Sequence, residues 1–133
     1  MATAKQSETV RTVLVIEDEE SLRMAVSRML RRRGFEVIEA ADGQMGVELF
    51  QTHKGSIDAV LLDLTLPHLS GREVLSELRQ MRPGVKVIVT TAYNEGSAWK
   101  KLYGQQAWGF LRKPYEVSEL VELLRAACES GRK

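Results

Sequence analysis

The 133-residue sequence has one cysteine, three prolines and almost no net charge. The single thiol, Cys128, cannot form an internal disulfide, which fits a reducing compartment. A formal net charge of +1 provides no broad basic field, so neither nucleic acid nor an anionic membrane is indicated as a partner. No apolar run approaches the ~18 residues of a membrane span, and the polar N-terminus has no apolar export segment. These absences together predict a cytoplasmic protein.

The size and composition are those of one globular domain. Hydrophobic residues make up 44% of the chain and charged residues 28%, which is typical of a folded protein with a buried core. Residues 1–11 are polar and show no periodicity, and we expect a disordered leader there. We predict a single domain over residues 12–130 and a short tail over residues 131–133.

Short β-branched runs alternate with amphipathic stretches along this domain. Strands are predicted over residues 12–16, 35–40, 59–62, 85–90 and 109–112. Helices are expected between and after them, over residues 22–30, 42–50, 70–82, 95–106 and 120–127, with Asp42 and Ser70 as N-caps and Gly34 as a C-terminal stop. Parallel strands need such crossovers, so the pattern predicts a three-layer α/β sandwich around a five-stranded parallel sheet.

Three consecutive basic residues, Arg31, Arg32 and Arg33, follow the first predicted helix. We interpret them as the solvated end of that helix, where cations interact favourably with the helix dipole.

Polar side chains come directly after four of the predicted strands. Glu17 and Asp18 follow the first, Asp63 the third, Thr91 the fourth and Lys113 the fifth. In open parallel sheets the functional site lies beyond the carboxyl ends of the strands. The five residues are therefore expected to gather at one edge of the sheet.

Asp63 ends an apolar run, and a buried carboxylate is costly unless it is paired or bound to a metal. Several carboxylates held close together are usually stabilised by a hard divalent cation with oxygen ligands, typically Mg²⁺. Lys113 adds a cation and Thr91 a hydroxyl that can donate a hydrogen bond. This set suits a carboxylate that is phosphorylated, with Mg²⁺, lysine and hydroxyl each holding a phosphoryl oxygen.

Four segments, "VLVIEDEE", "DAVLLDLTLP", "VIVTTAY" and "GFLRKP", occur in an order and spacing that resemble the receiver domain of bacterial two-component response regulators. The similarity runs from about residue 12 to residue 128. It implies a flavodoxin-like, chemotaxis-regulator-like fold with strand order 2-1-3-4-5. It also implies that the chain is no enzyme beyond its own phosphorylation and dephosphorylation, and that a histidine kinase or histidine phosphotransfer protein is its partner.

The resemblance implies roles for the acidic residues. Asp63 would be the phosphoacceptor. Mg²⁺ would be bound by Asp18, Asp63 and the backbone carbonyl of Thr65, with Glu17 acting through water. Aspartate is more usual than glutamate at the position of Glu17, and the longer side chain keeps the charge.

The resemblance also assigns the residues near the last two strands. Thr91 and Lys113 would bind the phosphoryl group, and Pro114 would be the cis-proline that follows the lysine. Phe110 stands at the position of an aromatic switch residue, and without a hydroxyl it would act through packing alone. Gln106 replaces a usual glycine.

Two positions in this family flank the path of the water that hydrolyses the acyl phosphate, here Thr65 and Tyr93. We predict that Tyr93 shields the phosphoryl group and slows self-dephosphorylation, so phosphate loss should be faster in Tyr93→Ala. The alternative is an exposed loop tyrosine.

The same residues bear on three other functions. A phosphatase of the haloacid dehalogenase type needs an acid two residues after the nucleophile, where this chain has Thr65. A flavin carrier needs a phosphate-binding loop after the first strand, and the acidic residues 17–20 would repel phosphate. A receiver that only docks remains the alternative, although Asp63, Thr91 and Lys113 are all present.

Phosphorylation is expected to switch the face formed by the helix over 95–106, the fifth strand and the last helix, with dimerisation as one possible result. The segments "SGREVL" and "AWGFLRKPY" resemble receivers of hybrid sensor histidine kinases more than those of transcription factors.

Overall fold

The computed structural model describes residues 10–66, 70–91 and 107–130. Residues 1–9 of the expected leader, the predicted helix over 95–106, and the positions of Tyr93 and Gln106 lie outside these ranges. Arg11, also placed in the leader, accepts the Glu36 backbone N–H on its carbonyl oxygen at 2.9 Å, so the ordered chain begins before residue 12. Within them, no helix has the length and the apolar character needed to cross a bilayer.

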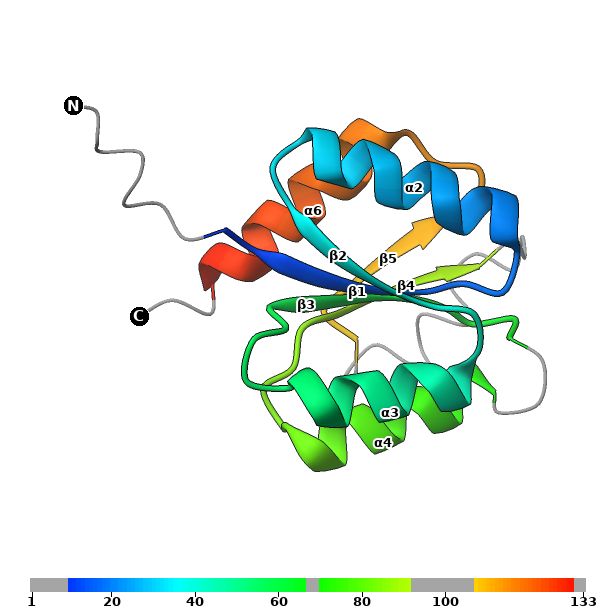
Figure 1. Cartoon of the computed structure of the whole chain (residues 1–133), viewed down its shortest axis with the longest axis vertical. Coiled ribbons are helices and arrows are strands. Elements are labelled where there is room, and N and C mark those ends of the chain that lie inside the picture. The colour runs from blue at the N-terminus through cyan, green and yellow to red at the C-terminus, as the bar shows by residue number, and fades with distance from the viewer. Residues whose placement is uncertain (1–9, 67–69, 92–106, 131–133) are drawn as a thin grey trace.

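The described residues form a five-stranded parallel sheet with helices on both faces (Figure 1). The strand order is β2-β1-β3-β4-β5, and every neighbouring pair is parallel. Helices α2 and α6 lie on one face, and α3 and α4 on the other. The predicted three-layer sandwich and its strand order are confirmed. The elements are β1 (Thr12–Ile16), α2 (Glu20–Arg32), β2 (Glu36–Ala40), α3 (Gly43–His53), β3 (Ala59–Asp63), α4 (Gly71–Met81), β4 (Val87–Thr91), β5 (Gly109–Arg112) and α6 (Val117–Ser130).

Each face of the sheet has its own apolar core. Phe50 and Leu75 belong to the core beneath α3 and α4, whereas Leu30 and Leu124 belong to the core beneath α2 and α6. Strands β3 and β4 are buried along their whole length. A strand covered on both faces cannot alternate apolar and polar residues, which explains the continuous apolar runs in the sequence.

The helix ends follow the predicted signals. The Asp42 side chain accepts a hydrogen bond from the Met45 backbone N–H at 2.8 Å, and Ser70 forms a capping box with Glu73. Gly34 follows Arg33, the C-cap of α2, and has a φ of 95°, a conformation that residues with a Cβ rarely adopt.

Four strand boundaries were predicted wrongly, by one or two residues. β2 begins at Glu36 rather than at residue 35, and β4 ends at Thr91 rather than at residue 90. β4 begins at Val87 rather than at residue 85, because the Val85 N–H bonds back to the Arg82 carbonyl and closes the turn after α4. Val85 is still buried, so its apolar character reflects packing and not strand pairing. β3 extends one residue further than predicted and includes Asp63. The carboxylate is therefore part of the sheet.

The first residue of α4, Gly71, lies against the loop that follows β3. A Cβ at this position would stand 2.7 Å from the Leu64 Cα, so the backbone would have to move. Gly71→Ala is expected to lower the free energy of unfolding by about 1–3 kcal/mol, measured by urea denaturation. Gly84→Ala is the matched control because a Cβ there meets nothing within 4 Å. Equal stability of the two variants would contradict the prediction.

Candidate functional site

The carboxyl edge of the sheet brings the predicted residues together. β1 is followed by Glu17 and Asp18, β3 ends at Asp63, and β5 is followed directly by Lys113. Thr91 ends β4, is buried, and accepts the Lys113 backbone N–H on its carbonyl oxygen at 2.8 Å.

Asp63 is 2% exposed and both of its carboxylate oxygens are hydrogen-bonded. Oδ1 accepts the backbone N–H of Thr65 at 2.9 Å and the Thr65 hydroxyl at 2.8 Å. Oδ2 accepts the Lys113 ammonium at 3.1 Å. Pairing and hydrogen bonding make the burial of this charge tolerable. The hydroxyl bond from Thr65 was not predicted from the sequence.

Lys113 bridges two acidic residues. Its Nζ lies 2.9 Å from Glu17 Oε1 and 3.1 Å from Asp63 Oδ2. Burial works to lower the pKa of Lys113, but the hydrogen bonds and charges of the two carboxylates outweigh burial and raise it. Burial raises the pKa of Glu17, together with the Asp63 charge, despite the bond to Lys113. With Asp18 beside Glu17 and Asp63, three carboxylates face the ammonium of Lys113, so the site holds more negative charge than this lysine compensates.

The surplus negative charge lies where a cation can bind. One carboxylate oxygen from each of Glu17, Asp18 and Asp63 lies within 4.8 Å of the others. Glu17 and Asp63 are buried and Asp18 is exposed, so the cluster opens to solvent on one side. Three carboxylates with access to water are the oxygen donors that a hard divalent cation prefers, and the donor set fits Mg²⁺.

Arg23 supports this cluster and was missed by the sequence analysis. Its Nη1 donates to the Glu17 carbonyl oxygen at 3.0 Å, and its Nε lies 3.3 Å from Glu39 Oε1. Glu39 lies on the edge strand β2, so the ion pair ties the turn after β1 to that strand. The sequence signal for this ion pair was the carboxylate of Glu39 within the short strand EVIEA.

The segment after β5 completes the site. The peptide bond between Lys113 and Pro114 is cis, as the resemblance implies. Phe110 is half-buried and packs against the core beneath α3 and α4. Burial and the nearby carboxylates raise the pKa of Tyr115 to about 12. The predicted shield, Tyr93, lies outside the described residues.

The raised pKa of Glu17 predicts how pH affects the metal-free protein. The folded chain binds a proton on Glu17 more readily than the unfolded chain does, so this group's contribution to stability is largest below its ordinary value of 4.5. That contribution is lost as the pH rises through the folded-state pKa. Glu17→Gln should therefore show a smaller loss of stability between about pH 5 and pH 7, measured by urea denaturation with a chelator.

Mg²⁺ provides a second measurement on the same variant. Because Glu17→Gln removes one carboxylate from the cluster, Mg²⁺ should stabilise it less than the parent chain. Glu77→Gln, which neutralises an exposed side chain on α4, is the matched control. The prediction fails if Glu17→Gln and Glu77→Gln respond alike to both pH and Mg²⁺.

Comparison with known proteins defines the class. Residues 13–125 match the response regulator receiver domain family, and the chain belongs to this family of two-component signalling domains. It is 35% identical over 118 residues to the sensor kinase CckA of Brucella abortus. The aligned region covers 89% of this chain and 12% of the kinase. The first three curated relatives are all longer, and the chain spans 12%, 29% and 59% of their lengths.

Solved structures agree with the family and the fold. A response regulator receiver domain protein from Clostridium thermocellum is 28% identical, with a TM-score of 0.87, over 92% of this chain and 98% of that one. The CheX–CheY complex of Borrelia burgdorferi, solved with BeF₃ and Mg²⁺, is 26% identical, with a TM-score of 0.80, over 87% of each chain.

Proposed function

We propose that this chain accepts a phosphoryl group on Asp63 from a histidine kinase or histidine phosphotransfer protein, in a reaction that requires Mg²⁺. The observation that carries the proposal is the environment of Asp63. Its buried carboxylate contacts the Lys113 ammonium and lies within a cluster of three acidic residues. A structural ion pair alone would not need this surplus of negative charge.

The residues that would hold Mg²⁺ are Asp18, Asp63 and the backbone carbonyl of Thr65, with Glu17 acting through water. The ion would cancel the negative charge that gathers when a phosphoryl group approaches the carboxylates. The chain contributes a preformed cluster, and the bond from Arg23 to the Glu17 carbonyl keeps the turn after β1 in place.

The transfer forms a bond between an Asp63 oxygen and phosphorus, while the bond from phosphorus to the donor histidine nitrogen breaks. Lys113 already contacts Asp63 Oδ2, so its ammonium can pass to a phosphoryl oxygen with a small movement. Thr91 supplies a hydroxyl to a second phosphoryl oxygen. Positioning and charge compensation are the main contributions of a protein to this chemistry.

The new charge on Asp63 then acts on its surroundings. Recruitment of Thr91 and Lys113 would alter the packing around Phe110 on β5. The face formed by β5, α6 and the helix expected over 95–106 is the proposed output surface, and phosphorylation-dependent dimerisation is one output. The chain would carry out no catalysis beyond its own phosphorylation and dephosphorylation, and we place it in the cytoplasm.

The match to part of a sensor kinase supports placing this receiver in a hybrid histidine kinase pathway. A receiver that docks without being phosphorylated is the alternative. It is disfavoured because Asp63 and Lys113 are both present and in contact.

The proposal is tested by measuring the intact mass of the chain after incubation with acetyl phosphate, with and without Mg²⁺. A single phosphoryl adduct that forms only with Mg²⁺ is expected. Reduction of the adduct with borohydride followed by peptide mapping should locate it at Asp63. If the folded chain forms no adduct from acetyl phosphate or from a phosphorylated histidine kinase, the docking alternative replaces the proposal.

A further inference from the structure

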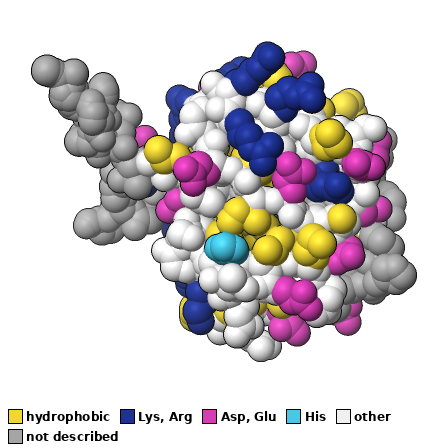
Figure 2. All heavy atoms as spheres, viewed as in Figure 1, with side chains coloured by type: hydrophobic (Ala, Val, Ile, Leu, Met, Phe, Trp, Pro, Cys, Tyr) yellow, Lys and Arg dark blue, Asp and Glu magenta, His cyan; other side chains and the backbone are white. Residues whose placement is uncertain are grey.

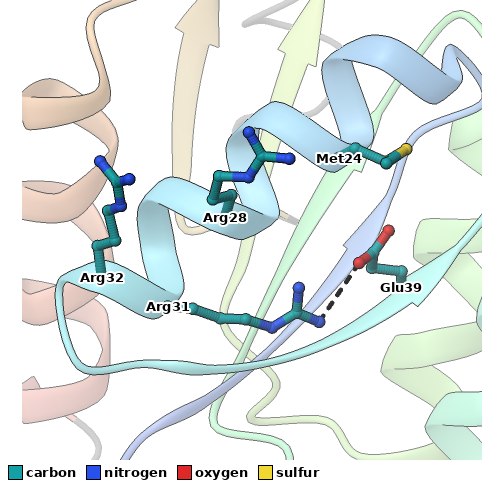
Figure 3. A pocket seen from close by; sticks show the side chains of 5 residues that line it. All are labelled: Met24, Arg28, Arg31, Arg32 and Glu39. Atoms are coloured by element: carbon teal, nitrogen blue, oxygen red, sulfur yellow. Dashed lines mark hydrogen bonds and ion pairs between the residues drawn. The ribbon is translucent and has the colours of Figure 1, made fainter.

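A groove rich in arginine lies between α2 and the edge strand β2, and none of the three acidic-cluster residues lines it. Met24, Arg28, Arg31, Arg32 and Glu39 line it (Figure 3). Its volume of about 360 Å³ is near the lower limit of pockets that enclose a small molecule. Because Met24, Arg28, Arg31 and Arg32 are exposed, the groove fits side chains from a surface segment better than an enclosed ligand.

The positive charge in this groove is only partly compensated. Arg31 Nη2 lies 3.3 Å from Glu39 Oε2 and also donates to the Val37 carbonyl oxygen at 3.2 Å. Glu39 is shared, because Arg23 binds its other oxygen. Within the described residues, Arg28 and Arg32 make neither an ion pair nor a hydrogen bond, and Figure 3 shows both side chains extending from the helix without a contact to Glu39.

The helix dipole accounts for only part of this cluster. Arg31 and Arg32 lie in the last turn of α2, where cations are favoured. Arg28 lies one turn earlier, where the dipole has little effect. Its position beside the other two therefore needs another explanation.

The surroundings indicate the chemistry of a partner. Figure 2 shows Lys and Arg side chains gathered over α2, with acidic and hydrophobic side chains close to them. Met24, in the groove itself, is 47% exposed. Guanidinium groups bind carboxylates in a planar, bidentate geometry, and an exposed methionine offers an apolar contact. A nucleic-acid backbone would need a broad basic surface, and the net charge of the chain is only +1.

We propose that this arginine groove binds an acidic segment of a partner protein, with carboxylates on Arg28, Arg31 and Arg32 and an apolar side chain over Met24. A carboxylate on Arg31 would replace Glu39, which keeps its contact with Arg23. Binding requires no phosphoryl transfer, so it can be tested separately from the proposed function.

The test is an NMR titration of the whole chain with a peptide of four glutamates and one leucine, observing the arginine Nε–H resonances. The signals of Arg28, Arg31 and Arg32 are expected to shift, and that of the exposed Arg72 on α4 is not. A peptide with glutamine in place of glutamate should produce no shifts.

A pair of charge variants makes the test quantitative. The double variant Arg28→Gln/Arg32→Gln should weaken the affinity for the peptide at least fivefold. The control double variant Lys54→Gln/Arg72→Gln removes two exposed charges elsewhere, and its affinity should stay within twofold of the parent chain's. Binding of a single-stranded oligonucleotide is measured with the parent chain and with the same two double variants. The proposal is overturned if the glutamate peptide does not bind, if both pairs weaken binding equally, or if the oligonucleotide binds as tightly as the peptide with the same dependence on Arg28 and Arg32.

Discussion

Asp63→Asn is expected to abolish the Mg²⁺-dependent phosphoryl adduct. An amide is not nucleophilic at oxygen in the way a carboxylate is, and it offers the cluster one fewer negative ligand. The variant should fold, because the asparagine carbonyl oxygen can still accept both hydrogen bonds from Thr65. Its amide nitrogen cannot accept a bond from Lys113, but the lysine keeps its contact with Glu17. Intact mass after incubation with acetyl phosphate and Mg²⁺ measures the effect.

The matched control for this variant is Asp42→Asn. Asp42 also follows a strand at the carboxyl edge of the sheet, and asparagine preserves its role as the N-cap of α3. Asp42→Asn should therefore form the adduct as the parent chain does. An adduct on Asp63→Asn at the parent's level would show that the phosphoryl group is bound elsewhere and would remove the basis of the proposed function.

Lys113→Gln is expected to slow adduct formation by about 10²-fold or more, the cost of removing a single group that stabilises developing charge. Lys113 contacts both Glu17 and Asp63, and its ammonium lies 3.1 Å from Asp63 Oδ2, where it can reach a phosphoryl oxygen on that carboxylate. Glutamine retains hydrogen-bonding capacity but not charge. The rate of adduct formation, followed by mass over time at fixed Mg²⁺, measures the effect.

The same variant should also lose stability in the absence of Mg²⁺. Without the ammonium, the buried carboxylates of Glu17 and Asp63 repel each other and have no cation. Mg²⁺ should restore more stability to Lys113→Gln than to Lys54→Gln. Lys54 is an exposed lysine at the C-terminal end of α3. A parental rate of adduct formation in Lys113→Gln would mean that this lysine has only a structural role.

Much of the fold could be predicted because its signals are local. The buried strands β1, β3 and β4 appear as apolar runs, and Asp42, Ser70 and Gly34 mark helix ends through the hydrogen bonds and backbone angles that those residue types favour. The start of β4 was missed because Val85 is buried in a turn. Burial and strand pairing produce the same apolar pattern in a sequence.

The sequence predicted which residues lie together at the site. It did not predict which of their atoms bind one another. Parallel strands bring their carboxyl ends to one edge, so Glu17, Asp63 and Lys113 were expected to gather there. That Lys113 contacts both carboxylates, and that the Thr65 hydroxyl bonds to Asp63, depends on side-chain distances that no spacing encodes.

The sequence by itself determined the alternating α/β architecture and the identity of the residues at the carboxyl edge, because apolar periodicity and strand ends are properties of neighbouring residues. Only the tertiary structure decided the ion pair between Arg23 and Glu39, and the arginine groove beside it. These join α2 to a strand that follows it in the chain, through long side chains whose partners are selected when the helix packs against the sheet. Such contacts depend on packing geometry, and a linear pattern does not contain it.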